Sequence, residues 1–336
     1  MILQKRFRIW CIALLAAILA FGLFALCTGQ FHIEVSRVFA ELFGAGSEVK
    51  DNVHTVIFNI RIPRVLMALV AGAGMAASGT AFQSLFANPL ATPDTLGVAN
   101  GASFGAALGI LLGGGAFQVQ LSALAFGIAA VLLVYAVTRS RRSGGTSVLM
   151  LILAGIVISS LFSALVSLIK YVADPQDVLP VITFWLLGSF SGITKNSMLL
   201  SVPLILAGTI LIFLLRFRLN ALSLPEEEAR SLGLNLRLIR VLVVGAASLT
   251  TASVVSVCGV IGWVGLLIPH ISRMLFGNDN RYVVPSSILS GGLFMLLVDT
   301  LARCATTSEI PVSILTAVIG APVFIILLRR TGGLKR

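Results

Sequence analysis

The chain has 336 residues, of which 57% are hydrophobic and only 11% are charged, and its mean hydropathy is +1.03. Soluble domains carry about 25% charged residues, so this composition excludes a soluble enzyme or binding module. The formal net charge of +11 comes from Lys and Arg residues between the apolar segments, which indicates membrane topology and argues against nucleic-acid binding. We expect an all-α polytopic membrane protein that forms one transmembrane domain over residues 1–336.

Ten apolar segments are candidates to span the membrane, because crossing a hydrocarbon core of ~30 Å takes about 20 apolar residues, or fewer where neighbouring helices shield the span. The first segment follows Lys5, Arg6 and Arg8 and begins like a signal peptide. It lacks a small-x-small cleavage site, so we expect a retained helix. The eighth is short and contains Pro269. The predicted spans are residues 9–28, 65–86, 98–112, 119–137, 148–169, 198–215, 238–257, 261–271, 282–301 and 314–328.

The distribution of Lys and Arg predicts the orientation of these spans. If the N-terminus lies inside, most of the 24 Lys and Arg residues fall in cytoplasmic connections. Ten spans then return both termini to the cytoplasm. Residues 29–60 become an extracytoplasmic segment, and residues 217–237 become a cytoplasmic loop.

The four cysteines and three histidines are scattered along the chain. They show no paired spacing and no two histidines one helical turn apart, so the sequence predicts neither a disulfide framework nor a protein metal site. A transported metal would therefore have to arrive in a complex with another molecule.

The sequence also lacks the groups of a self-powered transporter. No Lys is preceded by Gly and followed by Ser or Thr, so there is no P-loop to hold ATP. Asp299 is the only acid well inside a predicted span, and Arg303 follows it by four residues on the same helical face. This spacing favours a structural ion pair, while a proton relay remains the alternative.

One match to an enzyme motif has a packing explanation. Residues 101–105 fit Gly-x-Ser-x-Gly, but a nucleophile elbow needs a strand-turn-helix context and a histidine partner. Here glycine recurs every four residues in an apolar segment, which is typical of a small-residue face between membrane helices, at Gly101, Gly105, Gly109 and Gly113. The second predicted span has the same character at Gly72, Gly74 and Ser78.

Two charged regions flank the predicted spans. At the outer mouth of the second span, Arg61 and Arg64 surround Pro63, and Arg303 is expected near the same membrane face. Pro63 could start the helix while the arginines reach lipid headgroups, or the guanidinium groups could face outward and bind carboxylates of an external partner. Both interpretations fit the sequence.

The longest charged stretch lies between Arg216 and Arg240. Pro225 suits the first turn of a helix, the acids after it favour the helix dipole, and Gly233 can adopt the left-handed conformation that ends a helix. A docking surface for a cytoplasmic partner and an ordinary solvated loop would look alike here.

Seven motifs in order then identify a family resemblance. They are Arg-Ile-Pro-Arg at 61–64; Asn-Pro-Leu-Ala-Thr-Pro-Asp at 88–94 with Leu-Gly-Val at 96–98; Trp-Leu-Leu-Gly-Ser at 185–189; Ala-Arg-Ser-Leu-Gly at 229–233; Gly-Trp-Val-Gly-Leu-Leu-Ile-Pro-His at 262–270; Glu-Ile-Pro-Val-Ser-Ile-Leu-Thr at 309–316; and Gly-Ala-Pro-Val-Phe at 320–324. Together they resemble the permease subunit of the iron-chelate and cobalamin uptake ABC transporters, from about residue 61 to residue 330.

The resemblance implies a type II ABC importer permease fold of about ten transmembrane helices in a bacterial cytoplasmic (inner) membrane. It implies a second permease copy, identical or similar, two ABC ATPase subunits that bind ATP and Mg, and an extracytoplasmic substrate-binding protein. The chain itself would hold no cofactor and catalyse no covalent reaction. Ferric siderophore is the first substrate by family frequency, followed by haem, cobalamin and molybdate-type oxyanions.

The resemblance also implies roles for individual residues. ATPase coupling falls on Glu226, Glu227, Glu228, Ala229, Arg230, Leu232, Gly233 and Leu234. Glu228 replaces the first Ala of the general pattern Glu-Ala-Ala-x-x-x-Gly, and Pro225 stands where the family often has Gly, so the details of the contact are open. Docking of the binding protein falls on Arg61, Arg64 and Arg303, and the cytoplasmic gate falls on Thr146 and Ser147. The path is assigned to Ser159, Ser163 and Ser167, whose alternative role is hydrogen bonding between helices.

Two other classes stay open at this point. A secondary transporter with ten helices would run on an ion gradient and would need no cytoplasmic dock. A structural membrane subunit or receptor would move no solute.

Overall fold

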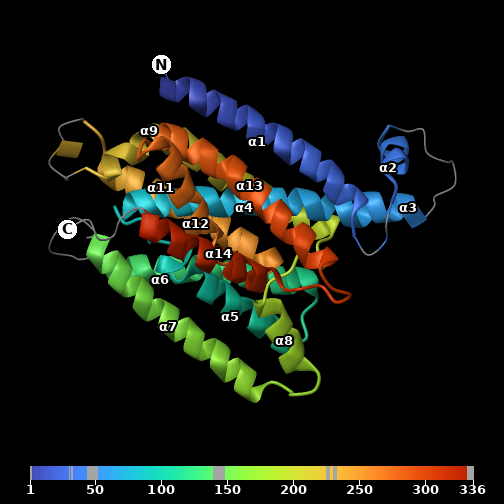
Figure 1. Ribbon diagram of the computed structural model, residues 1–336. Coiled ribbons are helices and arrows are strands. Elements are labelled where there is room, and N and C mark those ends of the chain that lie inside the picture. The colour runs from blue at the N-terminus through green and yellow to red at the C-terminus, as the bar shows by residue number, and fades with distance from the viewer. Residues whose placement is uncertain are drawn as a thin grey trace.

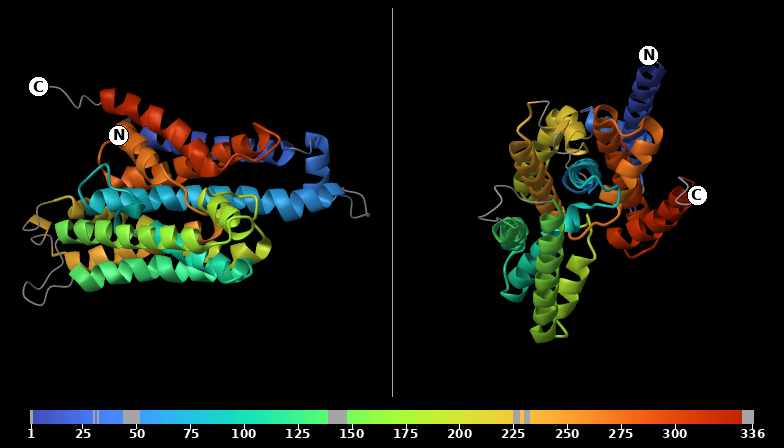
Figure 2. Two further views of the ribbon diagram at one scale, coloured as in Figure 1. Left: turned by 90° about the horizontal axis from the view of Figure 1, so that it is seen from below. Right: turned by 90° about the vertical axis from the view of Figure 1, so that its left-hand side faces the viewer.

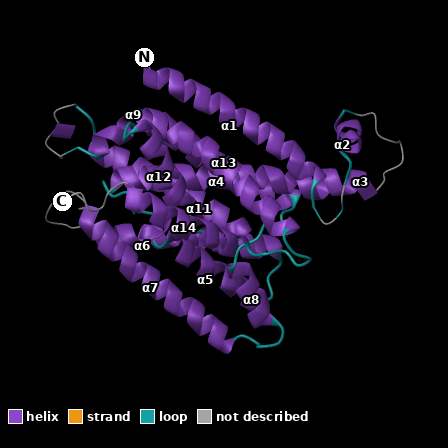
Figure 3. Cartoon of the chain, viewed as in Figure 1, coloured by secondary structure: helices purple, strands orange, loops and turns teal. Residues whose placement is uncertain are grey.

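The protein is a bundle of helices in a computed structural model that describes residues 2–29, 31, 33–43, 52–138, 148–224, 228–229 and 233–330. Within these residues no strand occurs (Figure 3). The elements, labelled in Figure 1, are α1 Ile2–Cys27, α2 Val35–Leu42, α3 Asn52–Thr55, the π-helix η1 Val56–Arg61, α4 Ile62–Leu85, the 3-10 helix η2 Pro93–Leu96, α5 Val98–Leu111, α6 Ala116–Thr138, α7 Val148–Val172, α8 Val178–Leu186, α9 Lys195–Leu222, α11 Leu236–Cys258, α12 Val264–Phe276, α13 Asn280–Cys304 and α14 Val312–Arg330.

The ten predicted spans each coincide with a helix. Seven of the described helices are long and apolar enough to cross a membrane, and three shorter apolar helices, α5, α12 and α14, complete the set. The start of α1 and the ends of α9 and α14 lie at one end of the bundle, which we call the termini end (Figure 2, left). The end of α1 and the starts of α4 and α14 lie at the opposite end, which we call the far end.

Helix α4 forms the centre of the bundle and is surrounded by α9, α11, α12 and α13 (Figure 2, right). Glycine permits this arrangement because it lets two backbones touch. A Cβ added to Gly72 would lie 2.2 Å from the carbonyl oxygen of Gly291, and one added to Gly79 would lie 1.8 Å from that of Gly265. The predicted small-residue face of the second span is thus confirmed.

The glycine repeat of α5 packs against α6. A Cβ on Gly101 would lie 2.5 Å from the carbonyl oxygen of Phe126, and one on Gly105 would lie 2.3 Å from that of Ser122. Gly113 comes after the helix and has no atom within 4 Å of such a Cβ. The packing interpretation is confirmed within the helix, and the repeat loses its packing role beyond it.

The start of the second span differs from the prediction. Pro63 lies in the first turn of α4, as one of the two interpretations expected, but helical structure already runs from Asn52 through η1 into α4. Proline inside a helix lacks an N–H and clashes with the carbonyl four residues earlier. A π-helical turn, η1, immediately precedes Ile62, whose N–H donates to the carbonyl oxygen of Ile57, five residues earlier.

Candidate functional site

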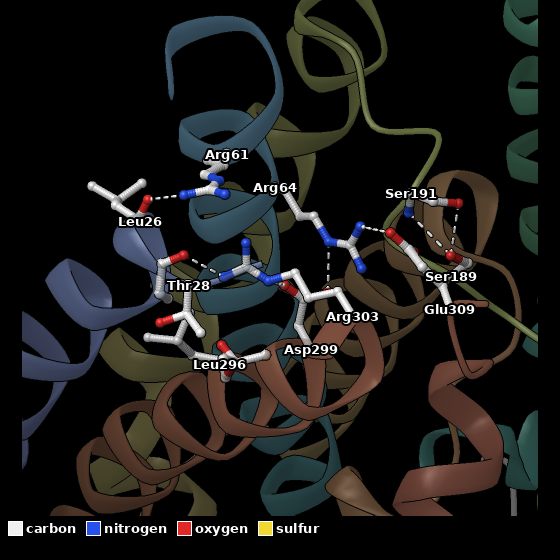
Figure 4. Close-up of polar contacts among 12 residues, drawn as sticks. Leu26, Thr28, Arg61, Arg64, Ser189, Ser191, Leu296, Asp299, Arg303 and Glu309 are labelled. Atoms are coloured by element: carbon white, nitrogen blue, oxygen red, sulfur yellow. Dashed lines mark hydrogen bonds and ion pairs between the residues drawn. The ribbon is translucent and has the colours of Figure 1, made fainter. Parts of the chain in front are cut away.

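Four charged side chains meet at the far end, and we call them the ion cluster: Arg64, Asp299, Arg303 and Glu309 (Figure 4). Arg64 donates from Nε to Asp299 Oδ1 at 2.8 Å and from Nη1 to Glu309 Oε1 at 2.7 Å. Arg303 Nε lies 3.7 Å from Asp299 Oδ2. The Asp299 side chain is fully buried, whereas that of Glu309 is 31% exposed. The cluster therefore joins α4 and α13 to the connection between α13 and α14.

Main-chain carbonyls at the end of α1 and just beyond it accept hydrogen bonds from two of the guanidinium groups at this end. Arg61 donates to the carbonyl oxygens of Leu26 and Phe31, and Arg303 donates to that of Ala25. Carbonyls in the last turn of a helix lack partners within the helix and carry partial negative charge. The end of α1 and the residues just after it thus compensate the cations that η1 and α13 bring into the bundle.

These contacts correct one prediction about the outer arginines. Arg61, Arg64 and Arg303 do lie together at one end, but each is only 4–5% exposed. The prediction that their guanidinium groups face outward is wrong in this structure, because Asp299, Glu309 and the end of α1 supply partners within the chain. Whether they also dock a partner stays a prediction.

The structural pair predicted from the i, i+4 spacing is confirmed, since Asp299 and Arg303 form an ion pair. Sequence reasoning missed that Arg64 is the closer partner of Asp299. The two residues are 235 positions apart, and no local pattern links them.

A cavity of about 550 Å³, the far pocket, lies beside the ion cluster. Its wall includes Glu309, Cys258 and residues of α8 and of the connection that follows it. Val312 N donates to Gly188 O at 3.0 Å, and Ser189 N donates to Cys258 O at 2.9 Å. Two motifs of the family resemblance, at 185–189 and 309–316, thus come together around this pocket. Because these motifs lie far apart in the sequence, their contact could not be predicted. The only local indication of a site was the single acid Glu309, which precedes a proline.

The predicted coupling segment is described in part. Glu228 is exposed, whereas Ala229 is fully buried in an apolar core that also contains Phe82 and Leu219. Gly233 has φ of +70°, which confirms the predicted left-handed conformation, and Leu234 packs on the same core. The remaining predicted coupling residues, Glu226, Glu227, Arg230 and Leu232, lie outside the described residues, as do the gate residues Thr146 and Ser147.

The three serines of α7 have different surroundings. Ser159 packs against Gly97, where an added Cβ would lie 2.9 Å from its Oγ. Ser163 and Ser167 are exposed on the surface of the single chain, and Ser167 donates to the carbonyl oxygen of Ser163 at 3.0 Å. This hydrogen bond lies within one helix, so the alternative role between helices is not what Ser167 has here. The role in a path stays a prediction.

Comparison with known proteins gives a match to the model of the FecCD transport family over residues 15–330. The chain is similar to the molybdate import system permease protein MolB of Haemophilus influenzae, with 40% identity over 95% of this chain and 93% of the relative. It is also similar to a probable iron chelatin transport system permease protein of Helicobacter pylori, with 39% identity over 96% and 97%.

A solved structure described as an inward-facing conformation of a metal-chelate type ABC transporter has a similar fold. The TM-score is 0.86 with 39% sequence identity, and the match covers 95% of this chain and 98% of that one.

Proposed function

The chain belongs to the FecCD transport family and is the permease of an ABC importer, and from this premise we propose that it carries a metal chelate, a ferric siderophore first, into the bacterial cytoplasm. The similarity to the solved metal-chelate type transporter carries this proposal, because it extends over nearly the whole of both chains. The relative named for iron chelatin supports the same substrate class.

The energy comes from partner subunits in this proposal. Two ATPase subunits bind ATP and Mg at the termini end, and a loaded substrate-binding protein arrives at the far end. A second permease copy completes the path between them, and both termini lie in the cytoplasm. Each partner favours one of two packings of the helices, so the permease alternates between opening outward and opening inward without covalent chemistry.

The predicted site residues have places in this cycle. The segment from Glu226 to Leu234 receives the movement of the ATPase subunits. Thr146 and Ser147 form the cytoplasmic gate, and the serines of α7 face the chelate in the assembled path. Docking at the arginines of the far end would require a partner's acid to replace Glu309 or the α1 carbonyls, which now occupy them.

We expect Gly233→Asp to abolish uptake and to uncouple ATP hydrolysis while the permease still folds. A Cβ at this position meets no atom within 4 Å, and aspartate tolerates the left-handed backbone better than most residues. Uptake and ATPase activity of the reconstituted transporter are the measurements. Gly113→Asp is the matched control, because Gly113 has φ of +72° and equally open surroundings away from the coupling segment. Normal transport by the Gly233→Asp variant would contradict the proposed role of Gly233 in ATPase coupling.

A molybdate-type oxyanion is the second candidate substrate, because the Haemophilus influenzae relative named for molybdate import is 40% identical. Deletion of the gene separates the two candidates. We expect uptake of radioactive ferric siderophore to be lost and uptake of radioactive molybdate to be retained. Loss of molybdate uptake alone would identify the oxyanion as the substrate. If neither uptake activity is lost, both candidate substrates are wrong.

A further inference from the structure

A second cavity, of about 450 Å³, lies at the termini end between the ends of α4, α9 and α12, and we call it the termini pocket. Most of its lining residues have polar side chains, and one of them is charged. The lining residues are Gln83, Ser84, Ala87, Asn88, Pro89, Asn220, Ser223, Arg273 and Asn278. Arg273 is thus a cation in a pocket whose own wall offers no anion.

The hydrogen bonds of Arg273 go to neutral groups. Its Nε donates to Gln83 Oε1 at 3.3 Å, and its Nη2 donates to Ser84 Oγ at 3.1 Å. No ion pair to Arg273 occurs in the described part of the chain. Arg64, at the far end, has two carboxylates instead. A partly buried guanidinium without an opposite charge is costly, and a carboxylate is the partner that its geometry fits.

The acid that follows Arg273 in the chain is already in use. Asp279 accepts hydrogen bonds from Asn220 Nδ2 at 2.9 Å and from Arg281 Nε at 2.6 Å, and it caps the first turn of α13. Burial alone would raise the pKa of Asp279, but these hydrogen bonds hold it below its ordinary value. The carboxylate of Asp279 therefore interacts with Arg281 and with the first turn of α13, and it does not form an ion pair with Arg273.

We propose that the termini pocket binds a carboxylate on Arg273, and that an acidic side chain of the ATPase subunit supplies it. This inference rests on the proposed function, since it requires an ATPase partner. Ser223, in the pocket wall, comes directly after α9, at the start of the segment that leads to Glu228 and Gly233. A protein that grips the coupling segment would thus reach the pocket with a neighbouring side chain.

The walls of the pocket favour a protein side chain over a lipid headgroup. One wall is the end of α4, which α9, α11, α12 and α13 surround. A phospholipid bound there would have to pass its acyl chains between packed helices. A carboxylate on a protein surface needs only the opening at the end of the bundle.

The proposal is tested by adding a carboxylate to the wall of the termini pocket by substitution, so that it competes with the partner's carboxylate for Arg273. The permease and the ATPase subunits that the proposed function requires are purified separately, the permease is placed in nanodiscs, and the dissociation constant is measured. Asn278→Asp adds a carboxylate to the pocket wall at an exposed side chain that makes no hydrogen bond among the described residues. We expect it to weaken ATPase binding about tenfold or more, as does Arg273→Met. Asn278→Ser is the matched control and should bind like the unchanged permease.

A charge exchange tests the pairing directly. Arg273→Glu should bind the ATPase weakly, and one acid-to-Lys substitution on the ATPase surface should restore its binding. Restoration by a single position supports the pairing, because a structural role of Arg273 alone would not respond to a change in the partner.

The other outcomes separate the two proposals. If the unchanged permease binds no ATPase subunit, the proposed function fails. If it binds and both Asn278→Asp and Arg273→Met bind equally well, the pocket proposal fails and the proposed function stands. If the effect of Asn278→Asp appears only in nanodiscs that contain anionic phospholipid, a lipid phosphate occupies the pocket. The proposal that an ATPase carboxylate binds there is then wrong.

Discussion

Replacing Asp299 with alanine is expected to lower the free energy of unfolding by about 3–5 kcal/mol. Asp299 is fully buried and is the only carboxylate that contacts both Arg64 and Arg303 among the described residues. Its removal leaves two buried guanidinium groups facing each other with the exposed Glu309 as the remaining acid. The cost comes chiefly from these uncompensated charges, because a buried ion whose partner is lost keeps its desolvation penalty.

The measurement is unfolding of the purified permease in detergent, by denaturant or by heat. Asp177→Ala is the matched control, because Asp177 is an exposed acid near the same end, and we expect a change within about 0.5 kcal/mol. The pair Arg64→Met with Asp299→Leu should cost less than the sum of the single substitutions, since it removes both charges. If Asp299→Ala is tolerated as well as Asp177→Ala, the ion cluster does not stabilise the far end.

Gly79→Val is expected to prevent folding or to destabilise the bundle by at least about 3 kcal/mol. A side chain at this position would meet the backbone of Gly265 and not a movable side chain, with Cβ 1.8 Å from the carbonyl oxygen. Helices α4 and α12 would have to separate, and α4 also packs against α9, α11 and α13, which hold it in place. The yield of folded protein in membranes and its thermal unfolding are the measurements.

Gly245→Ala provides the opposite result as a control. Gly245 lies within α11, and an added Cβ meets nothing within 4 Å. Alanine in a helix interior is favoured over glycine by about 0.5–1 kcal/mol, so we expect a small gain in stability. If Gly79→Val and Gly245→Ala behaved alike, backbone contact at Gly79 would not explain the packing of α4.

Segments that are local and apolar were predictable from the sequence. The length and composition of a span are contained in about 20 consecutive residues, so all ten spans coincide with helices, including the short one around Pro269. The helical run before Pro63 was not predictable, because it depends on a π-helical turn and its apolar residues are interrupted by polar ones. Helix α8 is apolar but only nine residues long, too short for the criterion of a span.

A feature of the candidate site was predictable only where a single short motif contains all the residues that form it. Gly233 could be placed in the left-handed region from its position alone. The partners of Arg64 could not, because Asp299 and Glu309 come from distant segments that meet only after packing. Arg273 gave no signal either, since an arginine at the end of a predicted span looks like an ordinary topology signal.

The central position of α4 also affects how the chain is made. The helices that surround it, α9, α11, α12 and α13, all follow it in the sequence, and the last of them begins only at Asn280. At a synthesis rate of roughly 5–20 residues per second, α4 waits on the order of ten seconds or more for its neighbours. During that time its glycine faces meet lipid or the insertion machinery, so the order of helices in the gene determines how long the core of the molecule stays unassembled.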